Sequence, residues 1–436
     1  MSAFDKVIGY DSIKEELMKF CDMMKNKEAY AKLGARPPHG ILIYGEPGLG
    51  KTLMAKCLIE ESGLKSYTLR RNKGNDDFVA NITDTFALAK ENAPSIVFLD
   101  DMDKFANEDE AHKNAMEYVA IQAGIDDVKE SDVYVIATGN EVWMLPRSLR
   151  RPGRFDVQVA VEAPEDRDAD DIIKYYLKDK PLAGDVDLSD LTKMMFYSSC
   201  AELEGVLNIA AINAGRKRKE KIEMADLVHA VLRTQYEFSG GHLDKDSDVN
   251  KKIALHEAGH LVVCEQLCPG SVGLAAVNPA VNEPAGLVHR CMRLPHWDDY
   301  VLVSLAGKTA VELYYSDDTM IGCSDDIESA YTTIRDKMAE NGTLGVGMID
   351  VTTKRFERTS ESLLARGEAA THAEMEKYIA MARKILLGNK AFLEETAREL
   401  LDKGTLLHSD IRRIREKYVP GDDNSPRCTE FGTKLS

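Results

Sequence analysis

The sequence predicts a multi-domain protein: an α/β domain built on a parallel sheet, then a helical segment, then a second, mostly α-helical domain. Three observations predict this fold class. With 436 residues, the chain is too long for one ordinary hydrophobic core, so two or three domains are expected. Up to about residue 165, short apolar runs alternate with helical patterns. Beyond that point the short runs stop and helical periodicity dominates, which indicates a change of architecture.

The first domain, residues 1–165, is expected to hold a parallel sheet with helices on both faces. It opens with an amphipathic segment in which Ile13, Leu17 and Phe20 recur at helical spacing. The segments that follow alternate between helical patterns and short buried strands, which favours a parallel sheet covered on both sides. The four expected strands are 40–44, 65–69, 95–100 and 132–138.

The rest of the chain divides into four expected parts. Several helices come first, then two glycines and a run of charge that predict a linker. A mostly helical region follows, with a short β segment between Val272 and Arg293. The last residues have no hydrophobic period and are expected to form a loose tail. The expected ranges are 166–240 for the helices, 241–248 for the linker, 249–420 for the second domain and 421–436 for the tail.

Composition narrows the class of protein. The net charge of −17 disfavours a protein that tracks nucleic-acid phosphates. No apolar run approaches the roughly 18–20 residues of a membrane helix, and the first residues do not resemble a signal peptide. The 8 cysteines form no CxxC pair, which suits a reducing cytosol. Cys264 and Cys268 are four apart on an expected helix and could share a face, but small buried hydrophobes are the favoured interpretation.

The stretch "GEPGLGKT" has the pattern of a phosphate-binding loop, and it lies between an expected strand and an expected helix, as this motif requires. Its glycines let backbone N–H groups surround phosphate oxygens, and the helix N-terminus adds positive potential. Lys51 is expected to reach the β- and γ-phosphates of ATP, and Thr52 to bind Mg²⁺. The expected nucleotide-binding residues here are Gly45, Glu46, Pro47, Gly48, Leu49, Gly50, Lys51 and Thr52.

Polar residues follow the next expected strands at their carboxyl ends, where ligands of parallel sheets gather. Asp100 is expected to hold Mg²⁺, and Asp101 to be the base that polarises the attacking water. Nucleotide hydrolases of this kind usually have Glu at the second position, and Asp is one methylene shorter, so the water would be held less well. Asn140 ends the following strand, where its amide could orient the water; by itself it is also typical of a turn.

The segment "LRRPGRFD" concentrates Arg150, Arg151 and Arg154 in an acidic chain. It is either a solvated basic turn or a pair of arginine fingers that reach the γ-phosphate bound by a neighbouring subunit. Together with "VIGYDSIKEEL", "GEPGLGKT", "IVFLDDMD" and "ATGN", it resembles an AAA ATPase module. The resemblance implies that Asn140 is the sensor, that Arg151 and Arg154 are the fingers of a homo-hexameric ring, and that residues 166–240 form the lid.

The stretch "HEAGH", residues 256–260, has the pattern of a zinc-peptidase helix. His256 and His260 are four residues apart, so both imidazoles project from one face of a helix and can bind one Zn²⁺. Glu257 lies beside that face and can accept a proton from the attacking water. We expect the small residues Ala258 and Gly259 to leave room for a substrate backbone. Two ordinary helical histidines are the alternative interpretation.

A catalytic zinc requires a third protein ligand, and spacing alone does not identify it. His289 and His296 are the next histidines along the chain. Asp325 and Asp326 open an expected helix. On local grounds the two aspartates are more typical of acids that favour the N-terminal end of the helix dipole.

The order of the ATPase module, "HEAGH", "LAGKTAVEL" and "CSDDIESA" resembles the FtsH family of ATP-dependent zinc metalloproteases from about residue 3 to about 418. The resemblance implies that Asp326 is the third zinc ligand, whereas Asp325 falls where the family usually has Asn. The segment "NEPAGLVHRCM" resembles the family's exposed edge strand, in which Gly286, Leu287 and Val288 would pair with an extended substrate. From the residues alone, an ordinary buried strand is an equal alternative.

Three features depart from the family pattern. Its usual N-terminal membrane anchor has no counterpart here, which implies a soluble or anchor-less member. Its pore triplet of aromatic, apolar and Gly residues corresponds to Phe78, Val79 and Ala80, in a segment that looks shorter. Phe78 is equally consistent with a core residue. Cys200 stands where the lid of the family usually has a Gly near the nucleotide.

The resemblance implies a cytoplasmic, ATP-dependent zinc metalloendopeptidase that unfolds, translocates and degrades unfolded or tagged proteins, with one Zn²⁺ per subunit and ATP with Mg²⁺. Two alternatives stay open. One is an AAA remodelling ATPase with a weak or unused zinc site, and the other is a zinc peptidase that its ATPase only gates slowly. The implied site residues are Glu257, Asp101, Asn140, Arg151 and Arg154 for catalysis, Asp100 beside the phosphate loop, and His256, His260 and Asp326 for zinc.

Overall fold

A computed structural model describes nine stretches of the chain and their packing. Its contacts divide the chain into two compact units, residues 1–180 with 197–208 and residues 181–196 with 209–436. The segment 166–240 therefore has residues in both units. The expected tail lies outside the described residues. The described residues are 2–35, 38–71, 77–106, 115–151, 153–238, 243–278, 285–315, 323–341 and 361–419.

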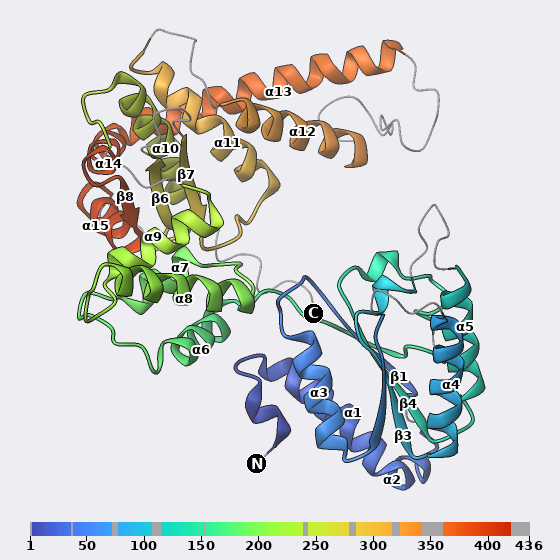
Figure 1. The fold of residues 1–436 in the computed structure, drawn as a ribbon. Coiled ribbons are helices and arrows are strands. Elements are labelled where there is room, and N and C mark those ends of the chain that lie inside the picture. Colours follow the sequence, from blue (N-terminus) through green and yellow to red (C-terminus); the bar gives the residue numbers. More distant parts are fainter. Residues whose placement is uncertain are drawn as a thin grey trace. The chain divides into compact units, whose positions relative to one another are not determined.

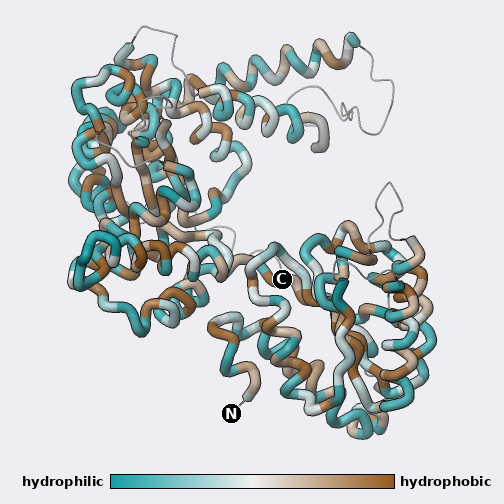
Figure 2. The backbone as a smooth tube through the Cα atoms, viewed as in Figure 1, coloured by the Kyte–Doolittle hydropathy of each residue, from teal (hydrophilic) through white to brown (hydrophobic). Residues whose placement is uncertain are grey.

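The first unit is built on a five-stranded parallel sheet in the order β2-β3-β4-β1-β5. The four runs predicted as strands are β1 to β4, so the expected parallel α/β sheet is confirmed. Figure 2 shows hydrophobic residues running along the strands of this sheet. The strands are β1 (Gly40–Tyr44), β2 (Lys65–Leu69), β3 (Ser95–Leu99), β4 (Val133–Gly139) and β5 (Val157–Ala160).

Helices cover both faces of this sheet, with α1 and α3 on one side and α4 and α5 on the other (Figure 1). The opening amphipathic segment is α1, which buries Leu17 and Phe20. The helices of this unit are η1 (Ala3–Lys6), α1 (Asp11–Lys25), α2 (Lys27–Ala31), α3 (Lys51–Ser62), α4 (Phe78–Glu91), η2 (Met102–Lys104), α5 (Ala115–Asp127), η3 (Val142–Met144), α6 (Asp166–Leu177) and the first half of α8 (Cys200–Arg216).

Phe78 lies in the hydrophobic core of the first unit. It begins α4, it is 3% exposed, and its ring packs edge-on against Phe105 with the ring centroids 5.3 Å apart. A side chain held in this way cannot grip a polypeptide in a pore. Of the two interpretations of Phe78, the structure supports the core residue and not the pore aromatic.

The second unit packs helices around a three-stranded antiparallel sheet in the order β7-β6-β8. The short β segment expected between Val272 and Arg293 is the pair of strands β6 and β7, and every residue of β6 is buried. The strands are β6 (Val272–Asn278), β7 (Ala285–Arg290) and β8 (Thr405–Leu407). The helices are α7 (Leu188–Met194), α9 (Met224–Gln235), α10 (Asp248–Leu267), α11 (Trp297–Glu312), α12 (Ser324–Asn341), α13 (Glu361–Gly388), α14 (Lys390–Lys403) and α15 (His408–Tyr418).

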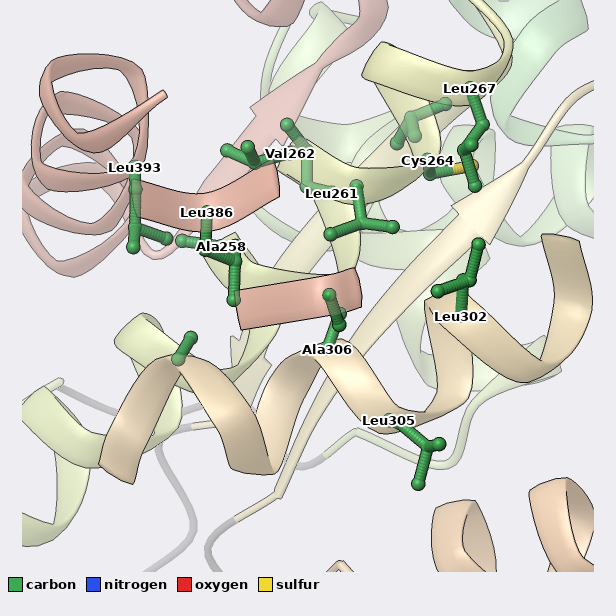
Figure 3. Packing of buried hydrophobic residues seen from close by; sticks show 14 of the residues in the cluster. Ala258, Leu261, Val262, Cys264, Leu267, Leu302, Leu305, Ala306, Leu386 and Leu393 are labelled. Atoms are coloured by element: carbon green, nitrogen blue, oxygen red, sulfur yellow. The ribbon is translucent and has the colours of Figure 1, made fainter. Parts of the chain in front are cut away.

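Helix α10 lies at the centre of this unit, and its apolar side chains pack with those of α11, α13 and α14 in one cluster (Figure 3). Ala258 is completely buried in that cluster. A Cβ on Gly259 would lie 2.6 Å from the Cβ of Ala310 and 2.7 Å from the carbonyl oxygen of Ala306. Gly259 therefore lets α11 approach α10, Ala258 packs in the core, and the expectation that these two small residues leave room for substrate is wrong.

The cysteines Cys264 and Cys268 belong to the same buried cluster, as the favoured interpretation predicted. None of the described helices is both long and apolar enough to cross a membrane.

Candidate metal centre and nucleotide site

Two imidazoles and one carboxylate converge beside α10. His256 and His260 project from one face of this helix, and their Nε2 atoms lie 2.9 Å apart. Asp326, in the first turn of α12, brings Oδ2 to 3.1 Å from Nε2 of His256 and 3.2 Å from Nε2 of His260. The three possible ligand atoms all lie within 4.8 Å of one another. Residues 70 positions apart in sequence are thus brought together by the packing of α12 on α11 and α11 on α10.

The other candidates for a third ligand lie elsewhere. Asp325 is exposed, and its carboxylate accepts a hydrogen bond of 3.4 Å from the Ser324 hydroxyl. His289 lies on β7 and is hydrogen-bonded through Nδ1 to the hydroxyl of Tyr236. His296 caps the N-terminus of α11. Of these residues, only Asp326 joins the two histidines.

Hydrogen bonds within the cluster fix the histidine orientation. A carbonyl oxygen can only accept, so the 2.6 Å contact between Nδ1 of His260 and the carbonyl of Val303 places a proton on Nδ1. The lone pair of neutral His260 is then on Nε2, which faces Asp326. Burial favours the neutral form of Asp326, but the two imidazoles outweigh it and hold the pKa of this carboxyl well below its ordinary value.

Gly307 of α11 forms the floor beneath both imidazoles. A Cβ at this position would lie 2.4 Å from Nε2 of His260 and 2.5 Å from Cε1 of His256. Only a glycine permits α11 to lie this close to the histidines. No role for Gly307 was expected from the sequence, although the small residues around it were a signal of close helix packing.

Glu257 lies beside the cluster and is 6% exposed. Burial, above all, raises the pKa of its carboxyl to about 7. A cation bound next to it would favour the carboxylate and act in the opposite direction. A carboxyl poised in this range can accept a proton and later return it.

A cleft of about 800 Å³ opens over these residues. One wall is β7, from which Gly286 lies against the carboxyl group of Glu257, and the other walls come from α11 and α12. Within the part of the chain that the structure describes, β7 pairs with β6 and leaves its other edge without a partner strand. The cleft is lined by Ile253, His256, Glu257, His260, Ala285, Gly286, Leu287, Val288, Arg290, Trp297, Tyr300, Val303, Ser304, Asp325, Asp326, Ser329 and Thr333.

These donors fit a catalytic zinc ion. Two imidazole nitrogens and one carboxylate oxygen are a common ligand set for such an ion, which needs three protein ligands and an open position. The cleft provides space on the open side of the cluster. The hydrogen bond from His260 to Val303 is the kind of support that metal-binding histidines usually have.

The expected phosphate loop connects β1 to α3 in the first unit. Gly48 and Gly50 have φ of 83°, and a Cβ on Gly45 would lie 2.0 Å from the carbonyl oxygen of Val161, so the loop depends on glycine. Lys51 is buried, and its ammonium group donates to the carbonyl of Glu46 at 2.6 Å. Burial lowers the pKa of Lys51. The loop leads into the N-terminus of α3, where an anion would be stabilised.

Asp100 directly follows β3 and is 4% exposed. Its Oδ1 accepts hydrogen bonds from the hydroxyls of Thr52, at 2.9 Å, and Thr138, at 3.0 Å. The loop and the ends of two neighbouring strands thus meet at Asp100, which is the geometry expected of a shared Mg²⁺ site. Thr138 was not anticipated, although its place at the end of an apolar strand was a signal.

Asp101 has a φ of 55°, in the left-handed region that Asp tolerates better than most residues. Its Oδ2 lies 2.6 Å from the ammonium of Lys104 and 3.7 Å from the guanidinium of Arg70. Asn140 is held by Asp103, which accepts from the backbone N–H at 3.1 Å and from the side-chain amide at 3.3 Å. Arg70 and Asp103 were not anticipated from the sequence.

The two candidate finger arginines differ in their surroundings. Arg151 is exposed. Arg154 donates to Asp126 at 3.1 and 2.8 Å and to the carbonyl of Ser148 at 2.7 Å. Arg154 is therefore oriented by its own subunit, whereas Arg151 presents its charge to solvent.

A second cleft of about 330 Å³ lies beside the phosphate loop. Its lining includes Tyr10, Gly48 and Cys200, and the Tyr10 hydroxyl lies 3.6 Å from the Cys200 sulfur. The backbone N–H of Ala201 donates to the carbonyl of Gly48 at 3.1 Å. Cys200, which stands where the lid of the family usually has a Gly, therefore lies close to the phosphate loop.

Comparison with known proteins agrees with this geometry. Residues 41–163 match the model of the ATPase family associated with various cellular activities (AAA). The chain is 30% identical to the ATP-dependent zinc metalloprotease FtsH 3 of Symbiobacterium thermophilum, and the match covers 96% of this chain and 71% of that protein. It is 31% identical to the ATP-dependent zinc metalloprotease FtsH of Caldicellulosiruptor bescii, and this match covers 94% of this chain and 71% of that protein. The protein of the same name from Thermus thermophilus is 30% identical over 95% of this chain and 70% of its own.

Proposed function

The chain belongs to the FtsH family of ATP-dependent zinc metalloproteases, and from this premise we propose that it unfolds protein substrates with ATP and cleaves them in the cleft beside β7. It is an ATP-dependent zinc metalloprotease whose cofactors are Zn²⁺ and ATP with Mg²⁺. The observation that carries the proposal is the convergence of His256, His260 and Asp326 within 4.8 Å beside Glu257.

We assign the zinc ion to His256, His260 and Asp326. A zinc ion held by these three residues would supply Lewis acidity to polarise the scissile carbonyl and to lower the pKa of the attacking water. Glu257 accepts the proton of that water and delivers it to the leaving amine, and its raised pKa supports this role. Burial of the cluster excludes bulk water from the histidines, which strengthens every charge interaction within it.

The edge of β7 is proposed to hold the substrate as an added strand. An extended backbone would hydrogen-bond to the free edge near Gly286, Leu287 and Val288, where the strand meets Glu257. A folded substrate cannot present such a backbone. Cleavage therefore has to follow unfolding, which gives a reason for an ATPase in the same chain.

Lys51, Thr52 and Asp100 are proposed to hold ATP and Mg²⁺ on the loop from Gly45 to Thr52, with Asp101 and Asn140 acting on the attacking water. Arg151 and Arg154 are proposed to act on nucleotide bound by a neighbouring subunit, which requires a homo-hexameric ring. A cytoplasmic location, and unfolded or tagged proteins as substrates, belong to the same proposal. The intact zinc cluster argues against the alternative of a remodelling ATPase with an unused zinc site.

Degradation of casein tests the proposal. The wild-type chain with ATP, Mg²⁺ and Zn²⁺ should degrade casein, and Glu257→Gln should abolish cleavage while it keeps both bound zinc and ATP hydrolysis. Omission of ATP should slow casein degradation much more than cleavage of a short unstructured peptide. If the wild type hydrolyses ATP but cleaves neither casein nor peptides, the peptidase assignment is wrong.

A further inference from the structure

Arg290 is a charged residue in the cleft that the proposed mechanism does not use. It is the last residue of β7 and lies four residues beyond Gly286. Among the described residues that line the cleft, it is the sole lysine or arginine. The acidic residues of the lining, Glu257, Asp325 and Asp326, belong to α10 and α12.

The Arg290 side chain is held in place by an aromatic ring. The Cζ atom of its guanidinium lies 4.5 Å from the ring centroid of Tyr300 on α11. The Tyr300 hydroxyl accepts a hydrogen bond of 3.2 Å from the backbone N–H of Leu294, which fixes that ring. A guanidinium stacked on an aromatic face keeps its N–H donors free for a ligand in the plane.

One end of the guanidinium lacks an acceptor. Nη1 of Arg290 is buried and makes no hydrogen bond to any described residue. A buried cationic donor without an acceptor is unfavourable, and a carboxylate is the group of a polypeptide that suits an arginine best, because it can accept two parallel N–H bonds. Because Nη1 is buried while Arg290 as a whole lines the cleft, a carboxylate that enters the cleft would meet Nη1 once the guanidinium turns towards it.

Arg290 lines the same cleft as the other residues near the free edge of β7. Gly286, Val288 and Arg290 are alternate residues of β7 and all three line the cleft, although the pairing of β7 with β6 shifts in register between His289 and Arg290. Gly286 faces the carboxyl group of Glu257, and Val288 packs against the core around α10. Arg290 lies about 13 Å along the strand from Gly286, at roughly 3.3 Å per residue.

We propose that Arg290 is a specificity-determining residue that selects a carboxylate on the substrate, four residues along the extended chain from the position opposite Gly286. An added strand puts the side chain of the residue opposite Arg290 on the same face as Arg290. The carboxylate comes either from an Asp or Glu side chain or from the free C-terminus of the substrate. This inference rests on the proposed peptidase function.

Blocked peptides test the inference with the full-length, zinc-loaded protein. A series based on one cleavable sequence, acetylated and amidated, carries Glu or Gln at each position on both sides of the cleaved bond. In the wild type, kcat/KM should be on the order of tenfold higher for Glu than for Gln at the position about four residues from the bond, and not at the other positions. The peptides of a second series contain no Glu and end at that position, either with a free carboxylate or with an amide. Faster cleavage of the free-carboxylate peptide would show that Arg290 selects the C-terminus of the substrate and not an acidic side chain.

Substitutions of Arg290 should change this ratio. Arg290→Met keeps an unbranched stem over Tyr300 and should reduce the ratio of Glu to Gln to about one. Arg290→Glu should invert the preference, so that a Lys peptide is cleaved better than a Gln peptide at the same position. Arg398→Met is the matched control, because Arg398 is exposed on α14 and pairs with Glu395 and Asp402 outside the cleft. It should keep the wild-type ratio.

Binding to Glu257→Gln provides a second readout in which nothing is cleaved. Fluorescence anisotropy should show tighter binding of the labelled Glu peptide than of the Gln peptide, and the difference should disappear when Arg290→Met is added. The inference is overturned if the wild-type ratio of kcat/KM for the Glu peptide to that for the Gln peptide is near one, or if this ratio is unchanged in Arg290→Met. Either result leaves the peptidase function intact. If no peptide is cleaved by the wild type, the proposed function itself fails.

Discussion

Gly286 of β7 and Glu257 of α10 are in direct contact: a Cβ on Gly286 would lie 2.4 Å from Oε1 and 2.4 Å from Cγ of Glu257. The backbone of the edge strand therefore runs directly past the acid that is proposed to move the proton. Because no side chain separates them, a peptide paired with β7 lies close to both Glu257 and the metal cluster. This contact links substrate binding to proton transfer through one residue.

Gly286→Ala should reduce peptidase activity while bound zinc is retained. The new methyl group cannot share space with the Glu257 carboxyl group, so either the carboxyl or the strand has to move. A displacement of about 1 Å at a reacting group costs on the order of 100-fold in rate. Cleavage of a short unstructured peptide measures kcat/KM, and metal analysis measures zinc.

Gly367→Ala is the control for that substitution. A Cβ on Gly367 of α13 meets no atom within 4 Å, so alanine there should leave cleavage unchanged. Full activity of Gly286→Ala would show that the strand can move away from Glu257 without consequence, and the proposed role of this contact would be wrong.

Gly307→Ala should weaken zinc binding. The methyl group would lie 2.4 Å from Nε2 of His260 and 2.5 Å from Cε1 of His256, so at least one imidazole has to turn away from Asp326. Changes in the support of metal ligands typically reduce metal affinity by 10- to 100-fold. Competition with a chromophoric chelator measures the affinity. Gly388→Ala, with open space around its Cβ, should bind zinc like the wild type; equal affinity in Gly307→Ala would contradict the expected displacement.

Asp326→Ala should lose zinc, and Asp325→Ala should keep it. Oδ2 of Asp326 lies 3.1 and 3.2 Å from the two Nε2 atoms, whereas Asp325 is exposed at the start of the same helix. The two aspartates are neighbours with the same chemistry, so each variant is a control for the other. Metal analysis after dialysis against a weak chelator distinguishes them. Loss of zinc in Asp325→Ala alone would reverse the ligand assignment.

The sequence predicts well those parts of the site that lie on one element. His256, Glu257 and His260 could be placed together because helical periodicity is local. Asp326 could not, because its local surroundings are those of a helix start, and only the family resemblance pointed to it. Gly307 contacts the histidines through the crossing of α11 over α10, and no local spacing encodes that crossing.

The strands show the same division between local and tertiary information. Central buried strands need nearly continuous apolar residues, so β1, β3 and β4 could be recognised to within a residue. The strands β5 and β8 have only four and three residues, lie at sheet edges with partly exposed side chains, and were not predicted, whereas the five-residue edge strand β2 was. For Phe78 the sequence left a pore role and a core role equal, because only the packing of α4 against Phe105 separates them.

Asp103→Ala should lower the ATP hydrolysis rate more than it weakens nucleotide binding. Asp103 accepts both the backbone N–H and the side-chain amide of Asn140, so its loss frees the proposed sensor to rotate. Loss of such orientation should reduce kcat about tenfold, because a misplaced group loses much of its contribution to the reaction. A coupled assay measures kcat and KM. Asp84→Ala, on the exposed face of α4, should be neutral; an unchanged kcat in Asp103→Ala would exclude a role for this contact.

Glu399→Gln should destabilise the second unit at neutral pH and not at pH 2. Arg413 binds Glu399 through two hydrogen bonds of 3.0 and 2.6 Å, Lys403 adds a third contact at 2.9 Å, and together they lower the pKa of Glu399 to about 2. Because the folded-state pKa lies below that of the unfolded chain, the stabilisation is present above about pH 5 and disappears as the pH falls towards 2. We expect a loss of about 2 kcal/mol at pH 7, since the buried side chain at position 399 loses charge-assisted hydrogen bonds. Urea unfolding followed by Trp297 fluorescence in a Trp143→Phe background reports on this unit, because these are the chain's 2 tryptophans.

The control for Glu399→Gln is Asp402→Asn, which removes a partner from an exposed pair with Arg398 and should cost under about 0.5 kcal/mol. A difference in stability between Glu399→Gln and wild type that persists at pH 2 would show that the ion pair is not its cause.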